Sequence, residues 1–269
     1  TVKLGVQRGN SPELLYFDVT RGDVPVNSVD VSFEAAKGIG YIKVSKFARN
    51  TYNEFITAIA KLKQAGCTSF VIDLRGNTGG YMDAAINMIN EFMPEGRLIV
   101  YTEGKSFPRS DVYANGTGTC KDAPIVVLTD EISASASEIF SGAIQDNDRG
   151  TIIGRRTYGK GLVQTQMSLS DGSEMRLTIA RYYTPSGRCI QKKYEMGNTD
   201  AYDQDIYNRY MHGEFDSADS IKMDDSLKYQ TVGGRTVYGG GGIMPDIFIP
   251  RDTSGVTSYY SNVRSEEHT

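Results

Sequence analysis

The chain has 269 residues, enough for one large domain with a sizeable apolar core, and 39% of them are hydrophobic. A net charge of −4 without any cluster of basic residues argues against a nucleic-acid partner, and no apolar run approaches the roughly 18 residues that a membrane-spanning helix requires. Three widely spaced cysteines, Cys67, Cys120 and Cys189, form no metal motif and no disulfide framework, although a single disulfide between two of them stays open.

The first elements along the chain are short strands. Alternating polarity predicts strands at residues 2–7 and 14–19, separated by a Gly-Asn-Ser-Pro turn, and two strands are too few to fold alone. A strand at 40–44 then precedes an amphipathic helix at 52–64, which Gly66 ends.

The next elements alternate between apolar strands and helices. They are a buried strand at 68–74, a helix at 82–93, strands at 98–101 and 124–128, a helix at 138–145, and strands at 151–154 and 162–167. This β-β-α repetition predicts an α/β core.

Beyond Arg188 the chain becomes acidic and rich in tyrosine. Residues 195–225 contain nine acidic and two basic residues, and we expect a short helix at 203–212. A solvated insertion is the simplest interpretation of this stretch, and contact with a partner or a neighbouring domain is the alternative.

The most informative segment is Ser133-Ala-Ser-Ala-Ser-Glu138, between the strand at 124–128 and the following helix. Small flanking residues allow Ser135 to be held on a sharp turn with its hydroxyl exposed, as in a nucleophile elbow. The alternative is structural, because Ser135-x-x-Glu138 also matches a capping box. The two histidines, His212 and His268, are not placed like a catalytic base, so a nucleophilic Ser135 would need a lysine as its base.

Lys160 is the candidate for that base. It lies 25 residues after Ser135 in a Gly-Lys-Gly turn between two predicted strands, and the glycines allow the backbone to bring the amine inward. A lysine amine buried in an apolar pocket loses its proton more readily and can then accept one from serine. A solvated loop lysine is the alternative. Gln164 would be about 13 Å away in a flat strand and touches Lys160 only if the turn bends the chain back.

A third candidate feature is the loop at the end of Phe70-Val-Ile-Asp-Leu-Arg-Gly-Asn-Thr-Gly-Gly80. Such a glycine-rich loop between a buried strand and a helix presents backbone N–H groups to an anion, which makes it a candidate oxyanion hole beside Ser135. A tight β-to-α turn without that role is the alternative. Asp73 and Arg75 can brace the loop as a pair, or form a plain surface ion pair.

Three blocks of the sequence resemble the signature blocks of the carboxyl-terminal processing (tail-specific) proteases, peptidase family S41. They are residues 73–80, 133–139 and 158–164, in the family's order and with its spacing of 25 residues between serine and lysine. Residues 237–246 are similar to a late strand block of the same family, and the resemblance extends from about 38 to 250.

The resemblance implies roles for individual residues. Ser135 would be the nucleophile, Lys160 the base and Gln164 the residue that orients the lysine. The oxyanion donors would be the N–H groups of Ala136 and of either Gly79 or Gly80, and Glu138 matches a helper position. Neither a metal nor a cofactor is implied.

The resemblance also implies the fold and the domain order. The core would have the fold shared by Clp protease and crotonase, preceded by the last strands of a PDZ domain. The expected parts are a PDZ remnant at 1–22, a connecting segment at 23–37, a peptidase core at 38–250 with a polar acidic insertion at 191–233, and a tail at 251–269.

The function that follows is a serine endopeptidase with a Ser-Lys dyad that cleaves proteins near their carboxyl termini. Its substrates would be unfolded or tail-exposed proteins bound as extended strands, its location would be the periplasm of a Gram-negative bacterium, and a homo-oligomer stays open. A ligand-binding relative without catalysis would have no reason to keep serine, lysine and glutamine together. A crotonase-type acyl-CoA enzyme would need an acidic base and a basic cluster for the CoA phosphates, which the sequence does not present.

Overall fold

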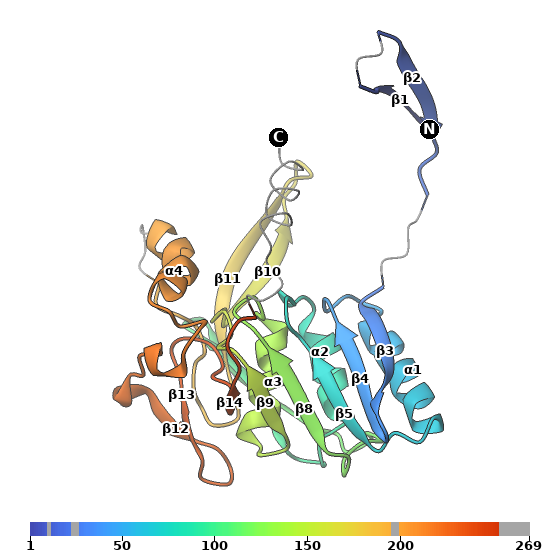
Figure 1. Ribbon diagram of the computed structural model, residues 1–269. Helices are drawn as coiled ribbons and strands as arrows, with labels where there is room; N and C mark the ends of the chain where they lie inside the picture. Colours follow the sequence, from blue (N-terminus) through green and yellow to red (C-terminus); the bar gives the residue numbers. More distant parts are fainter. Residues whose placement is uncertain (10–11, 23–26, 195–198, 253–269) are drawn as a thin grey trace.

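The computed structural model describes residues 1–9, 12–22, 27–194 and 199–252, and the chain forms a mixed α/β fold (Figure 1). Its central sheet has six strands in the order β14-β9-β8-β5-β4-β3. The strands are β3 (Val29–Ala36), β4 (Ile39–Val44), β5 (Ser69–Asp73), β8 (Ile125–Thr129), β9 (Thr151–Gly154) and β14 (Ile247–Phe248). Only β3 and β4 are antiparallel, and buried residues alternate with partly exposed ones along β4, β8 and β9, so one face of the sheet is buried more deeply than the other.

Three helices connect these strands: α1 (Thr51–Gln64), α2 (Met82–Asn90) and α3 (Ala136–Asp146). They lie side by side, with α2 in contact with both α1 and α3. Phe92, just after α2, forms the centre of the core, because its ring packs edge-on against Phe55, Phe70 and Phe140 with centroids 6.2–6.5 Å apart. This packing fixes α3, and with it the turn that carries Ser135.

A second sheet has the strand order β10-β11-β6-β7. Its strands are β6 (Leu98–Gly104), β7 (Phe107–Tyr113), β10 (Leu162–Ser168) and β11 (Glu174–Tyr183). β11 pairs with β6 only through residues 181–183, so the rest of the β10–β11 hairpin projects from the body of the molecule (Figure 1). β10 begins directly after Gly161 and is an edge strand.

The two faces of this hairpin differ in polarity. Gln166 pairs with Arg176 on one face, whereas Met167 pairs with Met175 on the other, and both methionines are exposed. Because partners in an antiparallel pair share a face, the alternation separates a polar face from an apolar one.

The remaining elements are α4 (Thr199–Met211), two short 3-10 helices (Ala218–Ser220 and Asp225–Leu227), a small β12–β13 hairpin (Lys228–Gln230 and Thr236–Tyr238) and a hairpin of β1 (Val2–Gln7) and β2 (Leu14–Val19). Every residue of β1 and β2 is exposed, as expected for two strands without a core of their own. None of the helices in the described part of the chain is long and apolar enough to cross a membrane.

Several expectations need correction. The segment at 23–37, expected only to connect two parts, contains β3, and β7 and β11 were not anticipated as strands. The expectation of a solvated insertion after Arg188 is wrong in part, because Arg209 and Glu214 are buried. All three cysteines are free thiols, so the disulfide that the sequence left open does not form. The tail at 251–269 lies almost wholly outside the described residues.

Candidate active site

Ser135 occupies the sharp turn between β8 and α3. Its φ of +57° and ψ of −113° are a backbone conformation that residues other than glycine rarely adopt. Neighbouring serines hold the turn: the Ser133 hydroxyl donates to the carbonyl oxygen of Leu74 (2.8 Å), and the Ser137 hydroxyl donates to that of Asn77 (2.9 Å). Buried hydrogen bonds therefore maintain the strained backbone of Ser135.

The Glu138 carboxylate lies beneath this turn and is fully buried. One oxygen, Oε2, accepts the N–H groups of Ser135 and Lys160 (2.8 Å each), and Oε1 accepts the Gly159 N–H (2.7 Å) and the Thr157 hydroxyl (2.5 Å). Burial raises the pKa of the Glu138 carboxyl, and the four donated hydrogen bonds oppose that rise. The bond from Ser135 is one half of the predicted capping box, and the other three bonds tie the helix start to the loop that carries Lys160.

That loop, residues 156–161, is called the lysine loop below. It is also held by the late glycine-rich block: the Ile243 N–H donates to the Thr157 hydroxyl oxygen (2.7 Å), and the Thr157 N–H donates to the Ile243 carbonyl oxygen (3.1 Å). Gly159 has φ +89°, in the region that glycine adopts readily, which permits the turn of the chain here.

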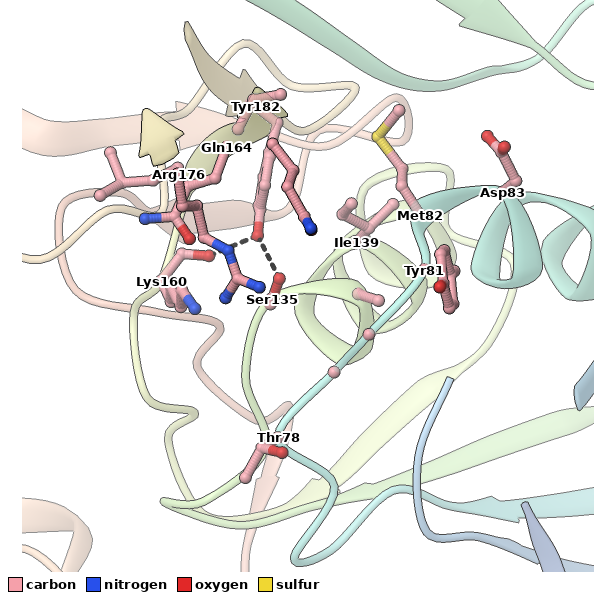
Figure 2. A pocket seen from close by; sticks show the side chains of 16 residues that line it. Thr78, Tyr81, Met82, Asp83, Ser135, Ile139, Lys160, Gln164, Arg176 and Tyr182 are labelled. Atoms are coloured by element: carbon pink, nitrogen blue, oxygen red, sulfur yellow. Dashed lines mark hydrogen bonds between the residues drawn. The ribbon is translucent and has the colours of Figure 1, made fainter. Parts of the chain in front are cut away.

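Lys160 and Ser135 line the same cavity of about 660 Å³ (Figure 2). Lys160 is half-buried, and its amine makes no hydrogen bond or ion pair to any of the described residues. Gln164 lines the cavity too, but its side-chain amide donates to the Thr178 hydroxyl (3.5 Å) and not toward the lysine. The fold thus brings the three predicted residues to one cavity without joining them by hydrogen bonds.

Tyr182, on β11, contacts Ser135 directly and was not anticipated. Its hydroxyl lies 2.9 Å from the Ser135 hydroxyl and 2.5 Å from the Lys160 carbonyl oxygen (Figure 2). A carbonyl oxygen can only accept, so the Tyr182 hydroxyl donates its hydrogen bond to the Lys160 carbonyl oxygen and accepts one from the Ser135 hydroxyl. Burial raises the pKa of the Tyr182 hydroxyl far above its usual value, so it stays protonated. No periodicity or motif in the sequence places this tyrosine beside a serine 47 residues away.

The glycine loop lies against the other side of Ser135. A Cβ atom on Gly79 would lie 2.7 Å from the Ser135 Cβ and 3.0 Å from the Ala136 nitrogen, so only glycine allows this approach. The Gly79 N–H donates to the Asn77 side-chain oxygen (2.8 Å). The N–H groups of Gly80 and Ala136 donate to no acceptor among the described residues, and both residues line the cavity.

Asp73 supports the start of this loop, and its contact with Arg75 is more than a plain surface ion pair. The Asp73 carboxylate is buried and accepts the Arg75 guanidinium (2.7 Å), the Arg75 N–H (2.8 Å) and the Tyr41 hydroxyl (2.5 Å). Burial alone would raise the pKa of this carboxyl, but the hydrogen bonds from Arg75 and Tyr41 outweigh it and hold the pKa below its usual value.

Two further observations limit the chemistry. Within the described ranges, no group of three or more His, Cys, Asp or Glu side chains is arranged to hold a metal ion. His212 is exposed at the end of α4 and bonds to the Asn208 carbonyl oxygen, away from the cavity, and His268 lies outside the described residues.

The model of peptidase family S41 matches residues 38–200, and the chain belongs to this family. The carboxyl-terminal-processing protease of Synechocystis is 38% identical over 179 residues, which cover 65% of this chain and 42% of the relative. The carboxy-terminal processing protease CtpB of Bacillus subtilis is 31% identical over 195 residues, covering 72% and 40%. The predicted resemblance to carboxyl-terminal processing proteases is therefore confirmed.

A solved structure of a photosystem II D1 C-terminal processing protease has a similar fold. Its TM-score is 0.56 at 34% sequence identity, and the match covers 66% of this chain and 49% of the other. The chain spans less than half the length of these relatives. The relatives come from cyanobacteria, from Gram-positive bacteria and, as a chloroplastic peptidase, from the alga Tetradesmus obliquus, so kinship does not single out a Gram-negative periplasm.

Proposed function

We propose that this chain is the catalytic part of a serine endopeptidase that uses Ser135 and Lys160 as a dyad and cleaves proteins near their carboxyl termini. The observation that carries the proposal is the strained backbone of Ser135 in a cavity that it shares with Lys160 and with two unused backbone N–H donors. Strain of this kind persists where the surrounding structure enforces it, and it is concentrated at active sites.

The reaction begins when the Ser135 oxygen attacks the scissile carbonyl carbon and the neutral Lys160 amine takes the hydroxyl proton. Because that proton points to Tyr182 in the resting site, the hydroxyl must first rotate toward the lysine. Lys160 then protonates the leaving amine, and water releases the acyl-enzyme.

The oxyanion is held by the N–H groups of Ala136 and Gly80. The Gly79 N–H is already donated to Asn77, which favours Gly80 as the second donor. Gln164 would orient the lysine after its amide turns away from Thr178, and this role stays a prediction.

The substrate would bind as an extended strand along the free edge of β10, which starts beside the lysine loop. Strand addition reads the backbone, as an endopeptidase of broad sequence tolerance requires. The assignments of β1 and β2 to the end of a PDZ domain, of the core to the fold shared by Clp protease and crotonase, and of the protein to the periplasm stay predictions. Fractionation of the native host tests the last of them.

The test uses a fluorophosphonate probe and peptide hydrolysis by the full-length protein. Ser135→Ala should lose probe labelling and hydrolysis together. The matched control is Ser141→Ala on the same helix, whose hydroxyl donates to the Ser137 carbonyl oxygen and lies outside the cavity, and it should keep both. Hydrolysis by Ser135→Ala within tenfold of wild type would overturn the assignment.

A further inference from the structure

The stretch after Arg188 encloses the lysine loop on the side opposite Glu138. Three groups make the contact: Gln191 and Lys192, the helix α4, and Glu214 beyond it. Together these are called the brace below. Its side chains Lys192, Arg209 and Glu214 are buried. Burying a charge is costly unless the charge is paired, so these contacts are a specific feature of the fold.

Lys192 joins the loop to α4. Its ammonium lies 4.0 Å from the ring centre of Tyr158, in the loop, and 4.1 Å from that of Tyr202, on α4. It also donates to the Tyr202 carbonyl oxygen (2.8 Å) and pairs with Asp205 (3.4 Å). A desolvated cation between two aromatic faces is among the stronger cation–π arrangements. The Lys192 backbone N–H donates to the Gly159 carbonyl oxygen (2.9 Å).

Gln191 holds the other flank of the base. Its side-chain oxygen accepts the Gly161 N–H (2.8 Å), and its amide group lies 3.4 Å from the Tyr202 hydroxyl. Glu138 and the brace therefore bond to different backbone groups around Lys160. The carboxylate accepts the N–H groups of Gly159 and Lys160, whereas the brace bonds to the Gly159 carbonyl oxygen and the Gly161 N–H.

Arg209 fixes the start of the loop. Its guanidinium donates to the carbonyl oxygens of Arg156 (2.7 Å) and Thr157 (3.0 Å) and to Glu214 (2.8 Å). Glu214 in turn accepts from the Arg156 guanidinium (2.5 and 2.7 Å). This buried triad links α4 to two consecutive carbonyl groups of the loop.

We infer that Gln191, Lys192 and Arg209 are positioning residues for Lys160, and that α4 serves to hold the candidate base at the Ser135 cavity. The inference rests on the proposed Ser135–Lys160 dyad. The Lys160 amine makes no bond of its own within the described residues, so its place is set by the backbone. That backbone is Gly-Lys-Gly, which has more conformational freedom than any other flanking sequence and needs outside restraint.

The test is Lys192→Met, which keeps the apolar stem and removes the ammonium. We expect kcat to fall about 10–100-fold with little change in KM, because displacing a reacting group by about 1 Å has costs of this order. Lower global stability alone would reduce the folded fraction and leave kcat per folded molecule unchanged.

Lys192→Arg should restore most of kcat, since a guanidinium stacks on aromatic faces as well. Lys222→Met, on an exposed residue of the same stretch, is the matched control and should behave as wild type. Thermal unfolding establishes the folded fraction of each variant. If Lys192→Met does not fold, Gln191→Met removes the acceptor of the Gly161 N–H and the amide contacts with the Lys192 carbonyl oxygen (2.9 Å) and the Tyr202 hydroxyl (3.4 Å), and it should lower kcat in the same way.

The outcomes separate the two proposals. If Ser135→Ala or Lys160→Met leaves hydrolysis intact, the proposed dyad is wrong. If both abolish hydrolysis while a folded Lys192→Met or Gln191→Met keeps the wild-type kcat, the dyad stands and the positioning role of the brace is overturned.

Discussion

The substitution Glu138→Gln changes a buried side chain that bonds to the backbone of both Ser135 and the lysine loop. The carboxylate accepts four hydrogen bonds, two at each oxygen. In the better orientation of the new amide, its oxygen keeps the N–H groups of Ser135 and Lys160. Its NH2 group then faces Thr157, whose hydroxyl can turn to accept, and the Gly159 N–H, which loses its acceptor.

The magnitude follows from these changes. Two charge-assisted bonds become neutral ones, at about 1 kcal/mol each, and one buried N–H is left unsatisfied, at about 1–3 kcal/mol. Relief from burying a charge offsets part of this, so we expect a net destabilisation of roughly 2–4 kcal/mol. For a domain of this size that lowers Tm by roughly 4–16 °C. We expect kcat to fall about 100-fold, because the bonds that join Ser135 to the lysine loop weaken and Gly159, next to Lys160, loses its acceptor.

Calorimetry and peptide hydrolysis on the full-length protein measure the two effects. The matched control is Glu131→Gln, the same substitution on a half-buried carboxylate whose ion-pair partner among the described residues is Arg155, at 2.6 Å. It should change stability by no more than about 1 kcal/mol and leave kcat unaltered. A Glu138→Gln protein with wild-type Tm and kcat would refute the reasoning that this carboxylate holds the site together.

Three other outcomes are expected. Lys160→Arg should be as inactive as Lys160→Met, because arginine keeps its proton at any working pH; substantial hydrolysis by the arginine variant would point to another base. Tyr182→Phe removes the acceptor of the Ser135 hydrogen bond, so kcat should fall about 3–30-fold and the free energy of unfolding should fall by only about 1–2 kcal/mol. An unchanged kcat would exclude a role of Tyr182 in placing the serine. Asp73 has a lowered pKa in the folded state, so its contribution to stability is present above the unfolded pKa near 3.9 and is lost as the pH falls through the folded pKa. The free energy of unfolding of Asp73→Asn should therefore depend less on pH in this range. Urea titrations between about pH 5 and 2 that give the same pH dependence for both proteins would contradict this.

Elements that pack against the core could be predicted from sequence because burial leaves a pattern of apolar residues. The strand ending at Asp73 and the helices α1, α2 and α3 are examples. β7 was missed because nearly all its residues are exposed, and β3 for the same reason, so neither carries an apolar run. Both strands are held by pairing with the neighbouring strand in the sequence, β4 for β3 and β6 for β7, rather than by burial of their own side chains.

The residues of the candidate site also fall into two groups, those that short motifs predicted and those that only the fold brings to the site. The sequence predicted Ser135, Lys160 and the glycine loop because each stands in a short motif of the local sequence. Tyr182 and Arg209 were not predicted, because each reaches its target only through the pairing of β10 with β11 or the docking of α4. An acidic, tyrosine-rich composition describes the surface of the stretch after Arg188 but not the few basic side chains that it buries.

The lysine loop is held by residues that lie far beyond it in the chain, and this has a consequence for synthesis. Gln191 reaches back 30 residues to Gly161, and Ile243 reaches back 86 residues to Thr157. A chain emerging from the ribosome, amino terminus first, therefore exposes its serine and lysine long before it makes the groups that hold them in register. If the chain is, as proposed, a peptidase of unfolded polypeptide, that order would postpone a working site until the nascent chain has folded and is no longer a substrate itself.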